Sequence, residues 1–196
     1  MKLAIIQDQL LTSSGSERVF LYIVETFPEA DIFTLAYNEK TTWDEYKKYT
    51  VNTSILNLFI RNHNTFKYLF PLSTIVMENW DFRKYDIIMT SSATTAKYIK
   101  RFKGKHICFC YTPTRAIWDT NAYFNSEGFI ASIKKNILHM LKKRDILSVK
   151  KIDRILTQSL YSKNNIKKIY RRNSEIIFPP IDFQKFNNAF NIEKKD

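Results

Sequence analysis

The sequence is poor in glycine and has no long apolar run. Only 3 of its 196 residues are glycine, and neither G-x-G-x-x-G nor G-x-x-x-x-G-K-[ST] occurs, which disfavours a Rossmann dehydrogenase and a P-loop enzyme. No apolar stretch approaches the ~20 residues that cross a bilayer, and Gln7 and Asp8 interrupt the apolar run near the start. We therefore expect neither a membrane span nor a secretory signal.

Cysteine and histidine are also scarce. The 2 cysteines, Cys108 and Cys110, would share one face of a strand with Cα atoms roughly 7 Å apart, too far for an unstrained disulfide. We expect buried thiols in a reducing cytoplasm. The 3 histidines, His63, His106 and His139, lack the spacing of metal ligands, so we expect no metal ion and no cofactor.

Acidic residues are outnumbered by basic ones. The chain has 31 Lys and Arg against 19 Asp and Glu, a net charge of +12, and residues 130–172 hold 13 of the former and 2 of the latter. That region alone carries +11. A hydrophobic content of 44% is ordinary for a folded chain, and the length fits one sizeable domain.

Short apolar runs alternate with longer segments of helical period, which is typical of a parallel sheet wrapped by helices. The runs expected to be strands are Lys2–Gln7, Ala30–Leu35, Thr50–Thr53, Asp86–Thr90, His106–Tyr111, Arg154–Thr157 and Glu175–Phe178. We therefore predict an α/β fold, a Rossmann-like, mostly parallel sheet of about seven strands flanked by helices.

Helices are expected between these strands. The expected segments are 16–27 with Ser16 as its cap, two helices in 57–82 broken at Pro71, 129–149 with an apolar stripe, and one starting near Ser159. The stripe consists of Ile130, Ile133, Ile137, Met140, Leu141 and Leu147. Pro179 and Pro180 fix an extended backbone, after which we expect a domain of residues 1–182 to pass into a linker, residues 183–196.

Two strand ends carry residues suited to binding. After the first strand, Gly15 lies where a sheet passes into a helix, and free N–H groups there suit a phosphate; alternatively Gly15 only permits a turn. After the strand at His106–Tyr111 follow hydroxyl, cationic, aromatic and carboxylate groups, a mixture that suits a sugar. The alternative is that Trp118 is core and Arg115 pairs with Asp119.

Several segments, in order, resemble the amino-terminal half of bacterial family 4 glycosyltransferases, especially O-antigen mannosyltransferase-like members. They are SSGSERVFLYIVETFPEADIFTL, YDIIMTSSATTAK, HICFCYTPTRAIWD, KKRDILSVKKIDRILTQSLYSKNNIKKIYRR and SEIIFPPIDFQKF. The resemblance implies two Rossmann-like lobes (GT-B), of which the chain is the acceptor-binding one, and a retaining, metal-independent transfer of a hexose from a nucleotide-sugar to a lipid-linked glycan in lipopolysaccharide synthesis. Without the donor-binding lobe, the chain alone should be inert.

The resemblance also implies site residues. Ser14, Gly15 and Ser16 stand at the family's diphosphate-binding loop, with one glycine replaced by serine, and Tyr111 stands at the position of a catalytic histidine. Gln158 and Ser159 replace an Asn-Ser pair. Together with the residue pattern, this gives an expected acceptor site of Asp8, Thr112, Arg115, Trp118, Asp119 and Gln158.

The basic region suggests further partners. Lys134, Lys135, Lys142, Lys143 and Arg144 suit anionic lipid headgroups on the inner face of the cell membrane, or else form a solvated face. A noncatalytic basic module, holding nucleic acid or a partner subunit, is the alternative function. Nucleic acid is disfavoured because no reading motif accompanies the lysines. An unpartnered cleft edge should also favour self-association.

Overall fold

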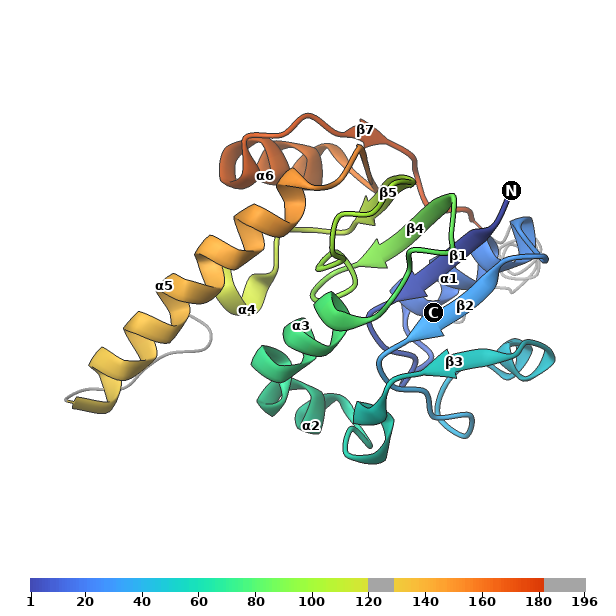
Figure 1. The fold of residues 1–196 in the computed structure, drawn as a ribbon, viewed down its shortest axis with the longest axis horizontal. Coiled ribbons are helices and arrows are strands. Elements are labelled where there is room, and N and C mark those ends of the chain that lie inside the picture. Colours follow the sequence, from blue (N-terminus) through green and yellow to red (C-terminus); the bar gives the residue numbers. More distant parts are fainter. Residues whose placement is uncertain (120–128, 182–196) are drawn as a thin grey trace, which may run out of the picture.

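The computed structural model describes residues 1–119 and 129–181, and the side chains of 129–135 are not described. It contains a parallel sheet of seven strands in the order β3-β2-β1-β4-β5-β6-β7 (Figure 1). The strands are β1 (Leu3–Gln7), β2 (Asp31–Thr34), β3 (Val51–Thr53), β4 (Ile87–Ser92), β5 (Lys105–Cys110), β6 (Arg154–Thr157) and β7 (Glu175–Ile176). The predicted α/β class and all the predicted strands are confirmed.

Helices follow the strands. They are α1 (Gly15–Thr26), η1 (Asp44–Lys48), η2 (Ile55–Leu58), α2 (His63–Tyr68), α3 (Phe70–Asn79), α4 (Arg115–Trp118), α5 (Phe129–Lys150) and α6 (Leu160–Tyr170). The two helices predicted within 57–82 are present as α2 and α3, and they meet beside Pro71. Pro71 lies in the first turn of α3, where its missing N–H is not needed. The expected linker, residues 183–196, lies outside the described residues.

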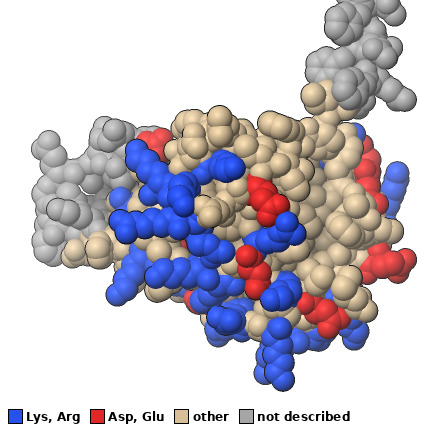
Figure 2. Space-filling model, turned by 90° about the horizontal axis from the view of Figure 1, so that it is seen from above, with Lys and Arg blue, Asp and Glu red and all other residues tan. Residues whose placement is uncertain are grey.

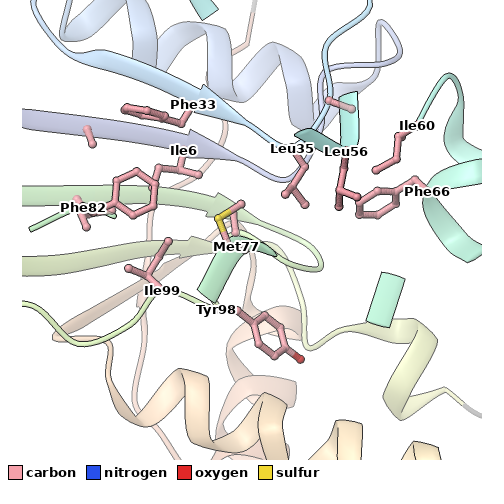
Figure 3. Packing of buried hydrophobic residues seen from close by; sticks show 14 of the residues in the cluster. Ile6, Phe33, Leu35, Leu56, Ile60, Phe66, Met77, Phe82, Tyr98 and Ile99 are labelled. Atoms are coloured by element: carbon pink, nitrogen blue, oxygen red, sulfur yellow. The ribbon is translucent and has the colours of Figure 1, made fainter. Parts of the chain in front are cut away.

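Alternate residues of β1 face opposite layers. Ile5 packs on α1 with Phe20 and Val24, whereas Ile6 on the other face joins Phe33 in a larger cluster. Figure 3 shows this larger cluster reaching Met77 of α3, Leu56 of η2, Phe66 of α2, and Ile60 between the last two elements. A third cluster holds Cys108 and Cys110 on one face of β5 against α6, and both are buried free thiols, as predicted.

The helix α5 projects beyond the sheet (Figure 1). It forms where the period predicts, but the predicted stripe is not a core face, since Ile137, Met140 and Leu147 are exposed. Leu141 is buried, against Phe70 and Ile117. The spacing of apolar residues therefore predicts the helix, but it does not predict which of its residues are buried.

Gly104 is required by the packing between β4 and β5. A Cβ atom there would overlap the Asp86 carbonyl oxygen and the Phe102 ring, and the backbone cannot move away without disturbing the Lys105 N–H bond to Asp86. We predict that Gly104→Ala lowers the free energy of unfolding by about 1–3 kcal/mol. Urea unfolding measures it, with Gly15→Ala as control because a Cβ at Gly15 meets open space. Equal losses would contradict the prediction.

Candidate functional site

The strand order reverses beside β1, because the chain runs outward to β2 and β3 and returns to the other side of β1 as β4. In open parallel sheets, ligands bind in the crevice outside the carboxyl ends of the strands at such a point. Three loops meet there, residues 8–14 after β1, 93–97 after β4 and 111–114 after β5. The sequence predicted the convergence of the first and third.

A buried glutamate holds the loop after β1. The Glu17 carboxylate, 2% exposed, accepts the backbone N–H groups of Leu11, Thr12 and Ser14 at 3.1, 3.1 and 2.8 Å, and the Thr12 hydroxyl at 2.7 Å. Ser14, not Ser16 as predicted, is the N-cap of α1, because Glu17 three residues later closes a capping box. The start of α1 is thereby fixed.

Gly15 is the first residue of α1 and is exposed. A Cβ there would have no atom within 4 Å, so neither a tight turn nor packing requires glycine. The first N–H groups of a helix have no partner within it, and they favour anions. The space beside Gly15 is therefore open to a ligand, and the diphosphate-binding role of Ser14, Gly15 and Ser16 stays a prediction.

Tyr111 joins the carboxyl ends of β4 and β5 to the start of α1 instead of pointing freely into the crevice. Its hydroxyl donates to the Ser16 carbonyl at 2.9 Å and lies 3.0 Å from Ser91 Oγ. Because the hydroxyl has one hydrogen, Ser91 is the donor in the second bond. Burial raises the pKa of Tyr111 well above its ordinary value, so it stays neutral. Its geometry is that of a residue that positions the loop carrying Gly15.

Asp8, predicted to bind the acceptor, is occupied by the protein. Its carboxylate, 4% exposed, accepts the four successive backbone N–H groups of residues 93–96 at 2.6 to 2.8 Å, together with the Ser92 hydroxyl at 3.1 Å. A carboxylate offers about four lone-pair positions. Asp8 thus anchors the loop after β4 and has no acceptor capacity left for a ligand.

Sequence reasoning missed a buried ion pair. Lys97 Nζ lies 3.2 Å from Asp145 Oδ1 and donates to Thr114 Oγ1 at 2.5 Å, and both charged side chains are 0% exposed. Burial is the largest single effect and lowers the pKa of Lys97, but the neighbouring groups, Asp145 first among them, together outweigh it and the net pKa is raised. The same carboxylate accepts hydrogen bonds from Tyr98, Trp118 and Tyr170 at 2.9, 2.7 and 2.6 Å. The sequence signal for this pair was Lys97 itself, which lies among small and apolar residues in the segment ATTAKYI.

The other predicted acceptor residues follow the carboxyl ends of β5 and β6. Trp118 is half-buried and packs on two core clusters, which supports its interpretation as core. Arg115 and Asp119 are exposed, and no ion pair joins them in the described part of the chain. Thr112 and Gln158 are half-buried. This edge of the sheet therefore keeps Arg115 and Asp119 exposed.

A hollow of about 410 Å³ lies next to the loop after β1. It is lined by Tyr37, Asn38, Glu39, Lys40, Lys47, Asn57, Ile60 and Arg61, which follow β2 and β3. The segment beside it packs on the loop, since Ser13 Oγ donates to the Thr41 carbonyl at 3.2 Å and Trp43 Nε1 to the Ser14 carbonyl at 3.3 Å. Sequence reasoning singled out none of the lining residues.

The basic residues predicted to face a membrane have mixed surroundings. Lys and Arg gather on the face that carries α6 and the end of α5 (Figure 2). Arg144 pairs with Glu78 at 2.8 Å, Lys142 lies over the Trp118 ring at 5.3 Å, and Lys143 is exposed. The side chains of Lys134 and Lys135 lie outside the described residues. None of the described helices is both long and apolar enough for a bilayer crossing.

The chain was compared with known proteins. By sequence it matches no protein-family model and no curated protein. By structure it is similar to the crystal structure of Anabaena Alr3699/HepE in complex with UDP, with a TM-score of 0.54 and 11% sequence identity. The match covers 94% of this chain and 45% of that one, so the chain spans less than half of that protein's length. At this identity the similarity shows a shared fold.

We predict that Asp145→Asn lowers the free energy of unfolding by about 3–5 kcal/mol, because the buried Lys97 ammonium loses its counter-charge. Urea denaturation measures the loss. Adding Lys97→Met should restore part of it. The control is Glu175→Gln, which removes the exposed pair with Arg154 and should cost at most about 1 kcal/mol. If Asp145→Asn and Glu175→Gln lowered the free energy of unfolding by similar amounts, burial would not make the Lys97–Asp145 pair more important than the exposed pair.

Proposed function

We propose that the chain is the acceptor-binding lobe of a retaining glycosyltransferase that moves a hexose from a nucleotide-sugar to a lipid-linked glycan in cell-surface polysaccharide synthesis. The observation that carries the proposal is the fixed, open helix start at Ser14–Ser16, located where the strand order reverses. The shared fold with a protein crystallised with UDP supports a nucleoside diphosphate at this edge. The hexose, the retaining course and the glycan rest on the family resemblance.

The chemistry explains why an open helix start matters. When the sugar leaves a nucleotide-sugar, negative charge grows on the departing diphosphate, and N–H groups aimed at it stabilise the transition state. The backbone at the start of α1 is held by Glu17, which accepts the Ser14 N–H, and by Tyr111, which donates to the Ser16 carbonyl. The N–H groups of Gly15 and Ser16 therefore need no rearrangement during the reaction. The lobe would supply a preorganised positive end for the diphosphate.

The same contacts limit what the lobe can do alone. Asp8 and Glu17 are saturated with hydrogen bonds, and Tyr111 is neutral and engaged, so none of them is free to exchange a proton with a substrate. Reacting groups, water exclusion and the grip on the nucleotide would come from a second lobe. We therefore propose that this chain by itself binds weakly and transfers nothing.

A lipid-linked acceptor requires contact with a membrane, and one surface suits it better than α5. Residues 54–77 contain no Asp or Glu. Within them Ile55, Leu58, Phe59 and Tyr68 are between 62% and 87% exposed. Exposed apolar and aromatic side chains without acidic neighbours favour the interface of an anionic bilayer. This segment also borders the hollow, through Asn57, Ile60 and Arg61.

Gly15→Val should weaken the binding of UDP and of inorganic pyrophosphate to the full chain at least fivefold, because a branched side chain would fill the space over the helix start. Ligand-observed NMR titration measures the affinities. Thr26→Val, on an exposed position at the other end of α1, is the control and should change nothing. No detectable binding, or equal binding by Gly15→Val, would contradict the proposed diphosphate site.

The membrane contact makes a separate prediction. Sedimentation with vesicles of phosphatidylcholine and phosphatidylglycerol should pull down the chain, and Leu58→Gln with Phe59→Gln should reduce the bound fraction severalfold, because both apolar side chains are exposed. Leu160→Gln with Tyr161→Gln removes comparable exposed apolar groups from α6 and should have no effect. Binding that resists the first pair but is lost with the second would refute the assignment of this segment.

A further inference from the structure

The hollow beside the loop after β1 has an excess of positive charge. Its lining includes Lys40, Lys47 and Arg61 but only one carboxylate, Glu39. Lys47 is paired with Asp44 at 2.7 Å. No ion pair joins Lys40 or Arg61 to a carboxylate within the described residues. Two cationic side chains without an ion pair in the described part of the chain therefore border this concave surface, against the single carboxylate of Glu39.

A second hollow shows that such charge is not a general consequence of a basic chain. It has about 380 Å³ and lies at the amino ends of β6 and β7. Three of its four cations are already engaged, all but the exposed Arg171. Arg154 binds Glu175 at 2.9 Å, Arg172 donates to two backbone carbonyls at 2.8 and 2.7 Å, and Lys167 donates to Asn173 at 2.8 Å. The first hollow thus differs from the second in charge available to a ligand.

The uncharged part of the first hollow suits a sugar. Asn57 Oδ1 accepts the Tyr37 N–H at 2.8 Å, which fixes the amide group at the rim. The half-buried Tyr37 offers apolar surface, while Asn38 and Asn57 offer amides for hydroxyl groups. A volume of about 410 Å³ falls in the range of small-molecule sites, about 300–1,000 Å³, so a ligand larger than a bare ion fits.

We propose that this hollow binds an anionic sugar acceptor, with its phosphate or carboxylate at Lys40 and Arg61 and its ring against Tyr37. The inference rests on the proposed function, to which it adds the charge of the acceptor. The contacts of Thr41 with Ser13 and of Trp43 with Ser14 bring the hollow next to the proposed diphosphate loop. An acceptor bound there would adjoin the sugar to be transferred.

Isothermal titration of the full chain tests the proposal with three probes: glucose 1-phosphate, glucuronate and glucose. At least one of the two anionic probes should bind at least tenfold more tightly than glucose. If only one of them does, its anionic group, phosphate or carboxylate, is the preferred group. Raising the salt concentration should reduce this preference. Equal affinity for glucose, or no binding of either anionic probe at millimolar concentration, would overturn the proposal.

Matched variants locate the site. Lys40→Gln with Arg61→Gln should weaken the anionic probe at least tenfold, whereas Arg101→Gln with Lys103→Gln, which removes the same charge from exposed positions near β5, should not. Equal weakening in both pairs would leave only a general charge effect and refute the site.

The titrations are repeated with Gly15→Val, which alters the diphosphate loop and should leave the sugar probes unaffected. If the chain binds pyrophosphate but neither glucose 1-phosphate nor glucuronate, the inference about the hollow is refuted and the proposed diphosphate site is not. The reverse result would support the hollow and refute the proposed diphosphate site.

Discussion

The buried pair of Lys97 and Asp145 is the interaction on which the arrangement of the carboxyl edge depends. A fully buried lysine remains charged only beside a carboxylate, and a buried carboxylate needs donors for all its lone pairs. Asp145 meets both conditions, because its other donors come from the loops and helices around it. Its bonds to Trp118 and Tyr170 join α4, α5 and α6 to the loop after β4. Ile137 and Met140 are exposed, whereas Leu141 and Val149 are buried in core clusters, so the later turns of α5 are the part anchored with Asp145.

Asp8 and Glu17 solve a related problem at the ends of the strands. Where parallel strands stop, their loops bring backbone N–H groups together in a buried place, and each needs an acceptor. Asp8 satisfies four in the loop after β4, and Glu17 satisfies three in the loop after β1. Acidic residues at a predicted ligand edge are therefore used here to build the edge. Residue type alone does not separate that use from catalysis.

Much of the fold could be predicted because each strand is a short apolar run with its own boundaries. The sequence predicted the end of β4 at Thr90, but the strand continues to Ser92. Ser91 and Ser92 belong to it because they pair with Phe109 and Cys110 of β5. Their hydroxyls contact Tyr111 and Asp8, which are distant in sequence. The cap of α1 was predictable in principle, since Ser14 and Glu17 have the spacing of a capping box.

The candidate site was less predictable, because its walls come from segments without periodicity. The hollow joins residues 37–47 to 57–61, and only the neighbouring positions of β2 and β3 bring them together. Composition pointed elsewhere, to the dense charge of residues 130–172. There Arg144 and Lys151 share Glu78, and Arg172 is bound by carbonyls.

Charge that already has a partner attracts a ligand weakly, because binding must first replace that partner. A concave surface bordered by uncompensated cations concentrates the electrostatic field instead. Lys40 and Arg61 therefore carry more weight in assigning a binding surface than the much larger number of lysines on α5 and α6. The chemical meaning of a basic chain is set by the cations that folding leaves unpaired within a hollow, and the total charge does not reveal which these are.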